Sequence, residues 1–309
     1  MRLGIFAKTF ARPSLGEALD AVRAHGLRCA QFNMSCAGLP AMPEEISPEL
    51  ADRIRREMDE RNLTMVAVSG TFNMIHPDPG ERREGLRRLA VLAGACGRLG
   101  TSVITLCTGT RDPEDMWRYH PDNDTPGAWR DLLASVEQAV RVAEEHEITL
   151  AFEPEVNNVI SSAERGRRLL DEIRSSRLKI VIDPANLFRE GDLACSDEIL
   201  DKAFGLLGED IVLAHAKDVK NTGEMVAAGR GELDYVRYLK NLRGVAFEGS
   251  LILHGLAESE VEGSVAFLRA RLGDSIAYSE RRGRRVGARS VPNEEESSSD
   301  AEQGACEVR

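Results

Sequence analysis

The chain has 309 residues, with 40 Lys and Arg against 51 Asp and Glu, which gives a formal net charge of −11. Hydrophobic residues make up 42% of it, an ordinary globular composition, and no run approaches the ~18 consecutive apolar residues of a membrane span. The acidic balance argues against a general nucleic-acid binder, because such binding depends on neutralising phosphates.

The spacing of the cysteines and the N-terminal segment indicate the cellular compartment of the protein. The cysteines stand far apart and form no C-x-x-C motif: Cys29, Cys36, Cys96, Cys107, Cys195 and Cys306. This pattern predicts reduced thiols rather than a disulfide or zinc framework. The N-terminal segment also lacks the long apolar stretch of a signal peptide. We therefore expect a cytoplasmic protein without a membrane partner.

Short apolar segments alternate with amphipathic stretches eight times along the chain. The predicted strands are 2–6, 27–32, 63–69, 102–107, 148–153, 178–183, 210–216 and 244–248. The predicted helices are 14–25, 48–61, 80–98, 127–146, 161–174, 196–207, 233–241 and 259–272. The strands are apolar throughout, which is typical of parallel strands buried on both faces.

Eight such units over residues 2–272 average roughly 34 residues each, which suits a (β/α)8 TIM barrel. A doubly wound open sheet is the competing interpretation. It would usually carry a Gly-rich phosphate turn after the first strand, but that turn reads FAKTFARPS, and no strand-to-helix junction carries such a motif. The sequence therefore predicts the barrel.

The pattern stops near the C-terminus. Residues 279–309 form a basic block followed by an acidic one and are rich in Arg, Glu and Ser. Such a segment buries too little apolar surface to offset its ordering entropy. We expect a barrel over residues 1–278 and a disordered charged tail over 279–309.

Polar residues end four consecutive predicted strands. They are Glu153, Asp183, His215 and Glu248, separated by 30, 32 and 33 residues. Active sites of such barrels lie at the carboxyl ends of the strands, and neighbouring strands lie about 5 Å apart. Burying three carboxylates together is costly unless a cation compensates them. The set predicts one divalent metal, Mn²⁺, Mg²⁺ or Co²⁺, with zinc less favoured.

These residues also carry a family resemblance. The signatures E-P-E, D-P-A-N, H-A-K-D, G-R-G-E-L-D and F-E-G resemble the sugar phosphate isomerase/epimerase family of the xylose-isomerase-like barrel superfamily, over residues 1 to about 272. The resemblance implies that Glu153, Asp183, His215 and Glu248 bind one divalent metal. It also implies a small sugar or sugar-phosphate substrate and a homodimeric or homotetrameric assembly.

One position departs from that family. Its epimerases commonly carry D-x-x-H on strand six, whereas this sequence has Asn186. An amide can donate and accept hydrogen bonds but does not titrate near neutral pH. The departure leaves the identity of the substrate open.

Further substrate contacts are expected around the barrel mouth. The candidates are His76, Trp117, Asn157, Asn186, Lys217 and Arg230. Arg230 lies in A-G-R-G, where the glycines allow close approach and a guanidinium could bind an anion bidentately. Trp117 belongs to a long insertion after strand four, and loops of that length are usually functional. For each of these residues a purely structural role is the alternative.

The expected chemistry is proton transfer next to a carbonyl through a metal-stabilised enediolate. Glu153 and Glu248 would act from opposite sides of the cation. An epimerase, an aldose–ketose isomerase or an inosose-dehydratase-like lyase could each use this site. An apurinic-site endonuclease of the endonuclease-four type is disfavoured, because Cys107 and Asn186 stand where such barrels need histidines. A non-catalytic sugar-binding barrel is disfavoured because both glutamates remain.

Overall fold

The computed structural model describes the backbone of residues 1–286 and the side chains of residues 1–273. The chain divides into two compact units, Met1–Arg271 and Leu272–Arg309. The first unit contains the complete barrel. Of the second unit, the described residues form only the C-terminal part of the last helix. The remaining part of the predicted tail, residues 287–309, lies outside the described residues.

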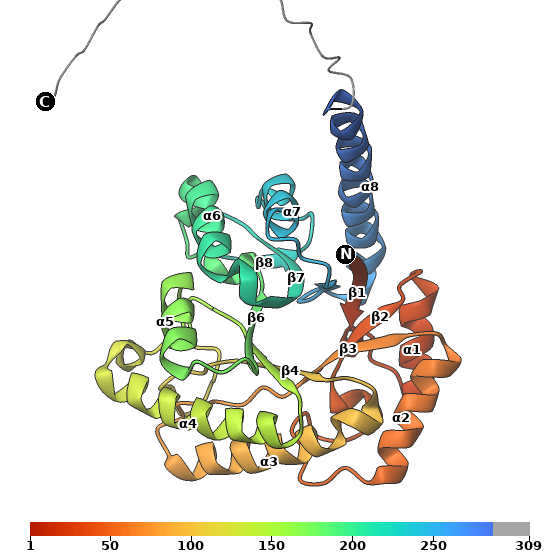
Figure 1. The fold of residues 1–309 in the computed structure, drawn as a ribbon. Helices are drawn as coiled ribbons and strands as arrows, with labels where there is room; N and C mark the ends of the chain where they lie inside the picture. The colour runs from red at the N-terminus through yellow and green to blue at the C-terminus, as the bar shows by residue number, and fades with distance from the viewer. Residues whose placement is uncertain (287–309) are drawn as a thin grey trace, which may run out of the picture. The chain divides into compact units, whose positions relative to one another are not determined.

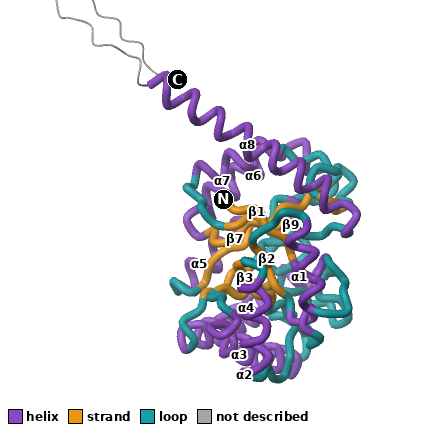
Figure 2. Tube along the Cα trace, turned by 90° about the vertical axis from the view of Figure 1, so that its right-hand side faces the viewer, coloured by secondary structure: helices purple, strands orange, loops and turns teal. Residues whose placement is uncertain are grey.

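Eight parallel strands close into a barrel, with the helices around them (Figure 1, Figure 2). The barrel strands are β1 (Arg2–Phe6), β2 (Cys29–Phe32), β3 (Thr64–Ser69), β4 (Val103–Leu106), β5 (Thr149–Phe152), β6 (Leu178–Ile182), β7 (Ile211–Val219) and β9 (Ser250–Leu253). Each strand pairs with the next along the chain, β7 pairs with β9, and β9 pairs back with β1. The predicted (β/α)8 barrel is confirmed.

A helix follows each barrel strand. The helices are α1 (Leu15–Ala24), α2 (Pro48–Glu60), α3 (Pro79–Leu99), α4 (Pro126–Glu145), α5 (Ala163–Ile173), α6 (Ser196–Leu207), α7 (Tyr235–Gly244) and α8 (Val261–Val286). Local sequence explains several of their ends. The Ser14 hydroxyl accepts a hydrogen bond from the Glu17 backbone N–H and caps α1. Gly100 ends α3 with a φ of +81°, a conformation that favours glycine.

The barrel interior is filled by side chains from alternating strand positions. One buried cluster consists of Phe6, Cys29, Ala67, Ala151, Val181, Leu213 and Ile252. These residues come from seven of the eight strands, so the interior is a packed core rather than a channel. Burial of this core fixes the strand registers and, with them, the positions of the residues at the strand ends.

The last third of the barrel differs from the prediction in two places. The final strand is β9 at Ser250–Leu253, not 244–248, because α7 continues to Gly244 and the more apolar segment SLIL enters the barrel. A short strand, β8 (Met225–Ala227), forms an antiparallel hairpin with the extended end of β7. In addition, α8 continues to Val286, eight residues into the segment predicted to be a tail. Among the described helices, none is long and apolar enough to cross a membrane.

Candidate active site

Four side chains meet where consecutive barrel strands reach their carboxyl ends. Glu153 follows β5, Asp183 follows β6, His215 is the middle residue of β7, and His254 follows β9. The strands β5, β6, β7 and β9 are neighbours in the barrel. Nδ1 of His215 lies 3.5 Å from Oε1 of Glu153 and 3.6 Å from Oδ2 of Asp183. The rings of His215 and His254 stack with their centroids 4.8 Å apart.

Three atoms of this cluster are buried without a hydrogen-bond partner: Oδ2 of Asp183, Nδ1 of His215 and Nδ1 of His254. Asp183, His215 and His254 each place one ligand atom within 4.8 Å of the other two. Unpaired buried polar atoms are costly, and most such groups in proteins have a partner. A carboxylate oxygen and two imidazole nitrogens converging in this way fit a divalent cation.

The orientation of His215 is set from the opposite side of its ring. Its Nε2 lies 2.8 Å from Oε1 of Gln31, on β2. Gln31 in turn donates from Nε2 to the Thr105 hydroxyl at 3.1 Å, which fixes the direction of the amide. With its Nε2–H donated to Gln31, a neutral His215 keeps the lone pair of Nδ1 on the side of Glu153 and Asp183. This is the arrangement in which an outer partner orients a metal-binding histidine.

Glu153 is held by a chain of polar contacts. Asn186 donates from Nδ2 to Oε1 of Glu153 at 2.6 Å, and Lys217 donates from Nζ to Oδ1 of Asn186 at 2.6 Å. Both predicted residues therefore lie beside the cluster at the strand ends. Asn186 uses its amide as a donor to one neighbour and an acceptor from the other, which a titrating imidazole would do only in one protonation state.

The electrostatics of the cluster keep opposite charges together. Burial alone would raise the pKa of Asp183, but Lys217 and His215 lower it to about 2. Burial lowers the pKa of His215, but the charges of Glu153 and Asp183 outweigh burial and raise it to about 9. Burial and His215 lower the pKa of His254, which stays neutral and able to donate a lone pair. A proton on His215 thus partly compensates the negative charge of Glu153 and Asp183, at the place where a cation would otherwise bind.

A second carboxyl group from the same strand end was not singled out from the sequence. Burial, followed by the charge of Glu153, raises the pKa of Glu155 to about 8. Lys217 and Asp183 also act on this group, so it lies within electrostatic reach of the cluster. At neutral pH the side chain of Glu155 is protonated, and it can donate a proton. A nearby dication would lower this pKa.

The chain also matches a known family. Residues 19–271 match the family described as xylose isomerase-like TIM barrel. The chain belongs to this family. A search among curated proteins finds no match.

Solved structures share the fold of this family member at low sequence identity. The first is an L-ribulose 3-epimerase, with 16% identity and a TM-score of 0.70, covering 94% of this chain and 99% of that one. The second is a 3-keto-D-glucoside 4-epimerase from E. coli, with 17% identity and a TM-score of 0.67, covering 87% and 99%. The third is a probable 3-DHS dehydratase from Bacillus anthracis, with 14% identity and a TM-score of 0.69, covering 87% and 99%.

One predicted ligand of this xylose isomerase-like barrel is wrong. Glu248 is exposed and lies before β9, at the amino end of the strand, whereas the cluster lies at the carboxyl end. The error follows from the misplaced final strand. With β9 at Ser250–Leu253, the residue that reaches the mouth is His254, whose backbone N–H bonds to the carbonyl of Ala216. The predicted pairing of Glu153 with Glu248 as acid and base therefore fails as well.

The other predicted contacts lie in the loops. Both ring nitrogens of His76 face loop backbone, the carbonyl of Pro113 and the N–H of Asp78, so His76 braces the loop after β3. Trp117, in the loop after β4, is 46% exposed. Asn157 accepts a hydrogen bond at its backbone carbonyl from Asn123. Their contacts with a substrate stay predictions.

Arg230 is exposed, with its guanidinium 4.0 Å from where a Gly263 Cβ would stand on α8. Its loop is organised by Asp218, which is buried and accepts backbone hydrogen bonds from Val219, Gly229 and Leu233. A Cβ on Gly231 would lie 2.3 Å from Oδ1 of Asp218, so only glycine fits there. The G-R-G-E-L-D signature thus builds a loop, and Arg230 remains a proposed contact.

The sequence carried signals for the residues that were missed. The apolar run S-L-I-L is followed by His254, just as the apolar run V-L-A of β7 is followed by His215. S-L-I-L also suits a buried strand better than G-V-A-F-E does. Gln31 stands at the end of the predicted second strand. Its role depends on packing across the barrel, which periodicity does not reveal.

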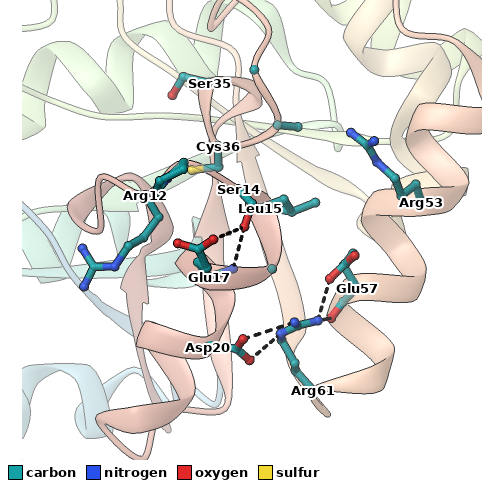
Figure 3. A pocket seen from close by; sticks show the side chains of 14 residues that line it. Arg12, Ser14, Leu15, Glu17, Asp20, Ser35, Cys36, Arg53, Glu57 and Arg61 are labelled. Carbon is teal, nitrogen blue, oxygen red and sulfur yellow. Dashed lines mark hydrogen bonds and ion pairs between the residues drawn. The ribbon is translucent and has the colours of Figure 1, made fainter.

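A pocket of about 590 Å³ lies apart from the cluster (Figure 3). It is lined by the loops after β1 and β2 and by α1 and α2. Its charges are largely paired: Arg61 binds both Asp20 and Glu57. No residue of the metal-ligand cluster lines it. Its volume is therefore no guide to the chemistry, which the unpartnered ligand atoms locate better.

Proposed function

We propose that this chain is a divalent-metal-dependent isomerase that moves a proton next to the carbonyl group of a small polyhydroxylated substrate, a sugar or a close relative. The observation that carries this proposal is the convergence of three unpartnered, buried ligand atoms at the carboxyl ends of β6, β7 and β9. Family membership and the sugar epimerases among the structures of the same fold support the substrate class.

Glu153, Asp183, His215 and His254 would hold the cation. Two imidazoles and two carboxylates favour a transition metal such as Mn²⁺, Co²⁺, Fe²⁺ or Zn²⁺ over Mg²⁺, which prefers oxygen ligands. When bound, such an ion supplies Lewis-acid polarisation of a carbonyl and stabilises the negative charge that develops as the proton leaves. Gln31 would keep Nδ1 of His215 available as a ligand.

The proton would be moved by the two carboxyl groups that follow β5. Glu153, oriented by Asn186, would remove a proton from carbon. Glu155, whose pKa burial and the charge of Glu153 raise to about 8 in the absence of a metal, would return one. Because both come from one strand end, they reach the substrate from the same side. Same-side transfer suits a shift of the proton to the neighbouring carbon, whereas epimerisation needs groups on opposite faces.

The same pair also favours a second candidate function, dehydration. A base that removes the proton and an acid beside it that protonates a leaving hydroxyl would perform a same-side elimination. A dehydratase is among the structures that share this fold. The two candidates use the same metal ligands and differ in whether a hydroxyl is lost.

The test is solvent exchange. Metal-free protein is reconstituted with Mn²⁺, Co²⁺ or Zn²⁺ and incubated in heavy water with a panel of ketoses, aldoses, their phosphates and inosose. Deuterium incorporation and product identity are then followed by NMR. We expect metal-dependent exchange at the carbon next to the carbonyl, and Glu153→Gln should reduce it by at least about 10³-fold, as for loss of a general base.

A matched control exists in the chain. Glu248→Gln makes the same chemical change at the opposite end of the barrel, and we expect its exchange rate to equal that of the wild type. Exchange that survives in Glu153→Gln, or is lost in Glu248→Gln, would contradict the assignment. Glu155→Gln separates the roles: exchange should continue while conversion to product slows.

A further inference from the structure

We propose that the substrate carries an anionic group, a carboxylate or a phosphate, at the end away from the metal, and that Lys8 binds this group. The inference rests on the proposed function and names the substrate class of the same site. It follows from the position of Lys8, from the absence of an acidic partner for it among residues 1–273, and from the charge that the ligand set leaves at the mouth.

Lys8 lies next to the metal-ligand cluster. Ile5 of β1 pairs with Leu253 of β9, so Phe6 and His254 follow next to each other, and Lys8 lies two residues further along in a 3-10 turn. Nζ of Lys8 lies 4.6 Å above the ring of Phe6. The Phe6 ring stacks on His254, with centroids 5.4 Å apart. The Phe6 ring thus contacts both the ammonium group and His254, and the charge of Lys8 acts on His254.

The ammonium group of Lys8 has no carboxylate partner among the described residues. The ion pairs and hydrogen bonds of that part of the chain do not include Lys8, and the titratable groups that interact with it are the Cys36 thiol and His254. Burial lowers the pKa of Lys8, so the charged form has lost some hydration without gaining a counter-ion. Lys217, by contrast, already donates to Asn186 and belongs to the support of Glu153. Lys8 is therefore a cation that acts on the cluster and is available to a ligand.

Replacement of a carboxylate by His254 changes the charge of the mouth. Glu153 and Asp183 together balance one dication, and the two imidazoles add no charge when neutral. Of the charged groups that act electrostatically on the cluster, Lys8 and Lys217 then exceed Glu155, even when Glu155 is ionised. These groups and a bound dication thus sum to a net positive charge, whereas a third ligating carboxylate would have made the sum zero. Such a site attracts an anionic substrate over a neutral one.

The test compares three ketoses that share one end and differ at the other: fructose, fructuronate and fructose 6-phosphate. Binding to the metal-loaded protein is measured by calorimetry, together with metal content. We expect fructuronate or fructose 6-phosphate to bind at least 10-fold more tightly than fructose, and the better of the two identifies the anion. Lys8→Gln should reduce that advantage to less than 3-fold and leave fructose binding and metal content unchanged. Lys8→Arg should keep part of the advantage.

Lys240→Gln is the control, because it removes one positive charge from α7, outside the barrel. It should preserve the advantage of the anionic ketose. Equal binding of all three ketoses by the wild type, including no binding of any, would overturn the assignment, as would a full advantage in Lys8→Gln. A wild type that retains no metal would instead overturn the proposed function, so the two failures are distinguishable.

Discussion

Charged side chains at the carboxyl ends of the strands differ from those on the α6–α7 surface in their burial and in their hydrogen-bond partners. At the strand ends, Asp183 and His215 are buried, and each leaves one atom without a hydrogen-bond partner. On the surface, Arg237 of α7 binds Asp197 and Asp201 of α6, and all three are accessible to solvent. The surface groups are satisfied within the protein. At the strand ends, these single atoms gain a partner only when something else binds, which marks them as a candidate site.

The largest expected effect tests this contrast at His254. His254→Ala removes one of the converging ligand atoms, and we expect metal affinity to fall by at least about 100-fold, more than the loss of an outer partner costs. His254→Glu supplies a carboxylate at the same position and should retain the metal. Both are measured by metal content after dialysis and by titration of metal into the stripped protein. Unchanged affinity in His254→Ala would show that the convergence does not bind a cation.

Asp218 shares one property with each region. It is buried like the cluster, and like the surface groups it has hydrogen-bond partners within the protein, here backbone N–H groups. Asp218→Ala leaves three N–H groups without their acceptor, and we expect a loss of about 3 kcal/mol in the free energy of unfolding. Asp218→Asn keeps Oδ1 and should cost about half as much. Denaturant titration measures both. A change below about 1 kcal/mol in Asp218→Ala would show that water replaces the carboxylate.

Substitution of Gln31 should have a smaller effect, and it should change metal affinity rather than the free energy of unfolding. Gln31→Leu keeps the volume but removes the acceptor for Nε2 of His215. Outer partners of metal-binding histidines typically contribute 10- to 100-fold in affinity, and we expect a loss in that range. Gln31→Glu should restore the acceptor and most of the affinity. An unchanged affinity in Gln31→Leu would indicate that packing alone orients the imidazole.

The barrel and three of the four cluster positions could be predicted because they depend on local patterns. Apolar strands, helix caps and a polar residue at the end of a strand can all be recognised in the sequence, as at Glu153, Asp183 and His215. The fourth position failed because two neighbouring segments both resemble a strand, and only packing against β1 and β7 selects Ser250–Leu253. A shift of six residues moved the assigned ligand from His254 to Glu248, at the other end of the barrel.

The residues that act on the cluster through packing and burial could not be predicted from the sequence, for a different reason. Gln31 is 184 residues from His215 along the chain, and their contact depends on the closure of the barrel. The role of Glu155 depends on its burial beside Glu153, and no sequence pattern distinguishes a buried carboxyl group from a solvated one in a loop. Such residues become visible only when distances and burial are known.

The smallest effect is expected on the α6–α7 surface, where the charged groups already have partners. Hydrogen bonds from Arg237 and Asn241 lower the pKa of Asp201 from its ordinary 3.8 to about 2. Because the pKa is lower in the folded state, the pair stabilises the protein above about pH 3.8, and this contribution is lost as the pH falls towards 2. The groups are exposed, so Asp201→Asn should change the free energy of unfolding at pH 7 by less than about 1 kcal/mol. It should also slightly flatten the dependence of stability on pH between 4 and 2, measured by denaturant titration in that range. Metal affinity should not change, because a pair that is already satisfied on the surface contributes nothing to the cluster at the strand ends. A loss of metal in Asp201→Asn would remove the distinction between the two regions.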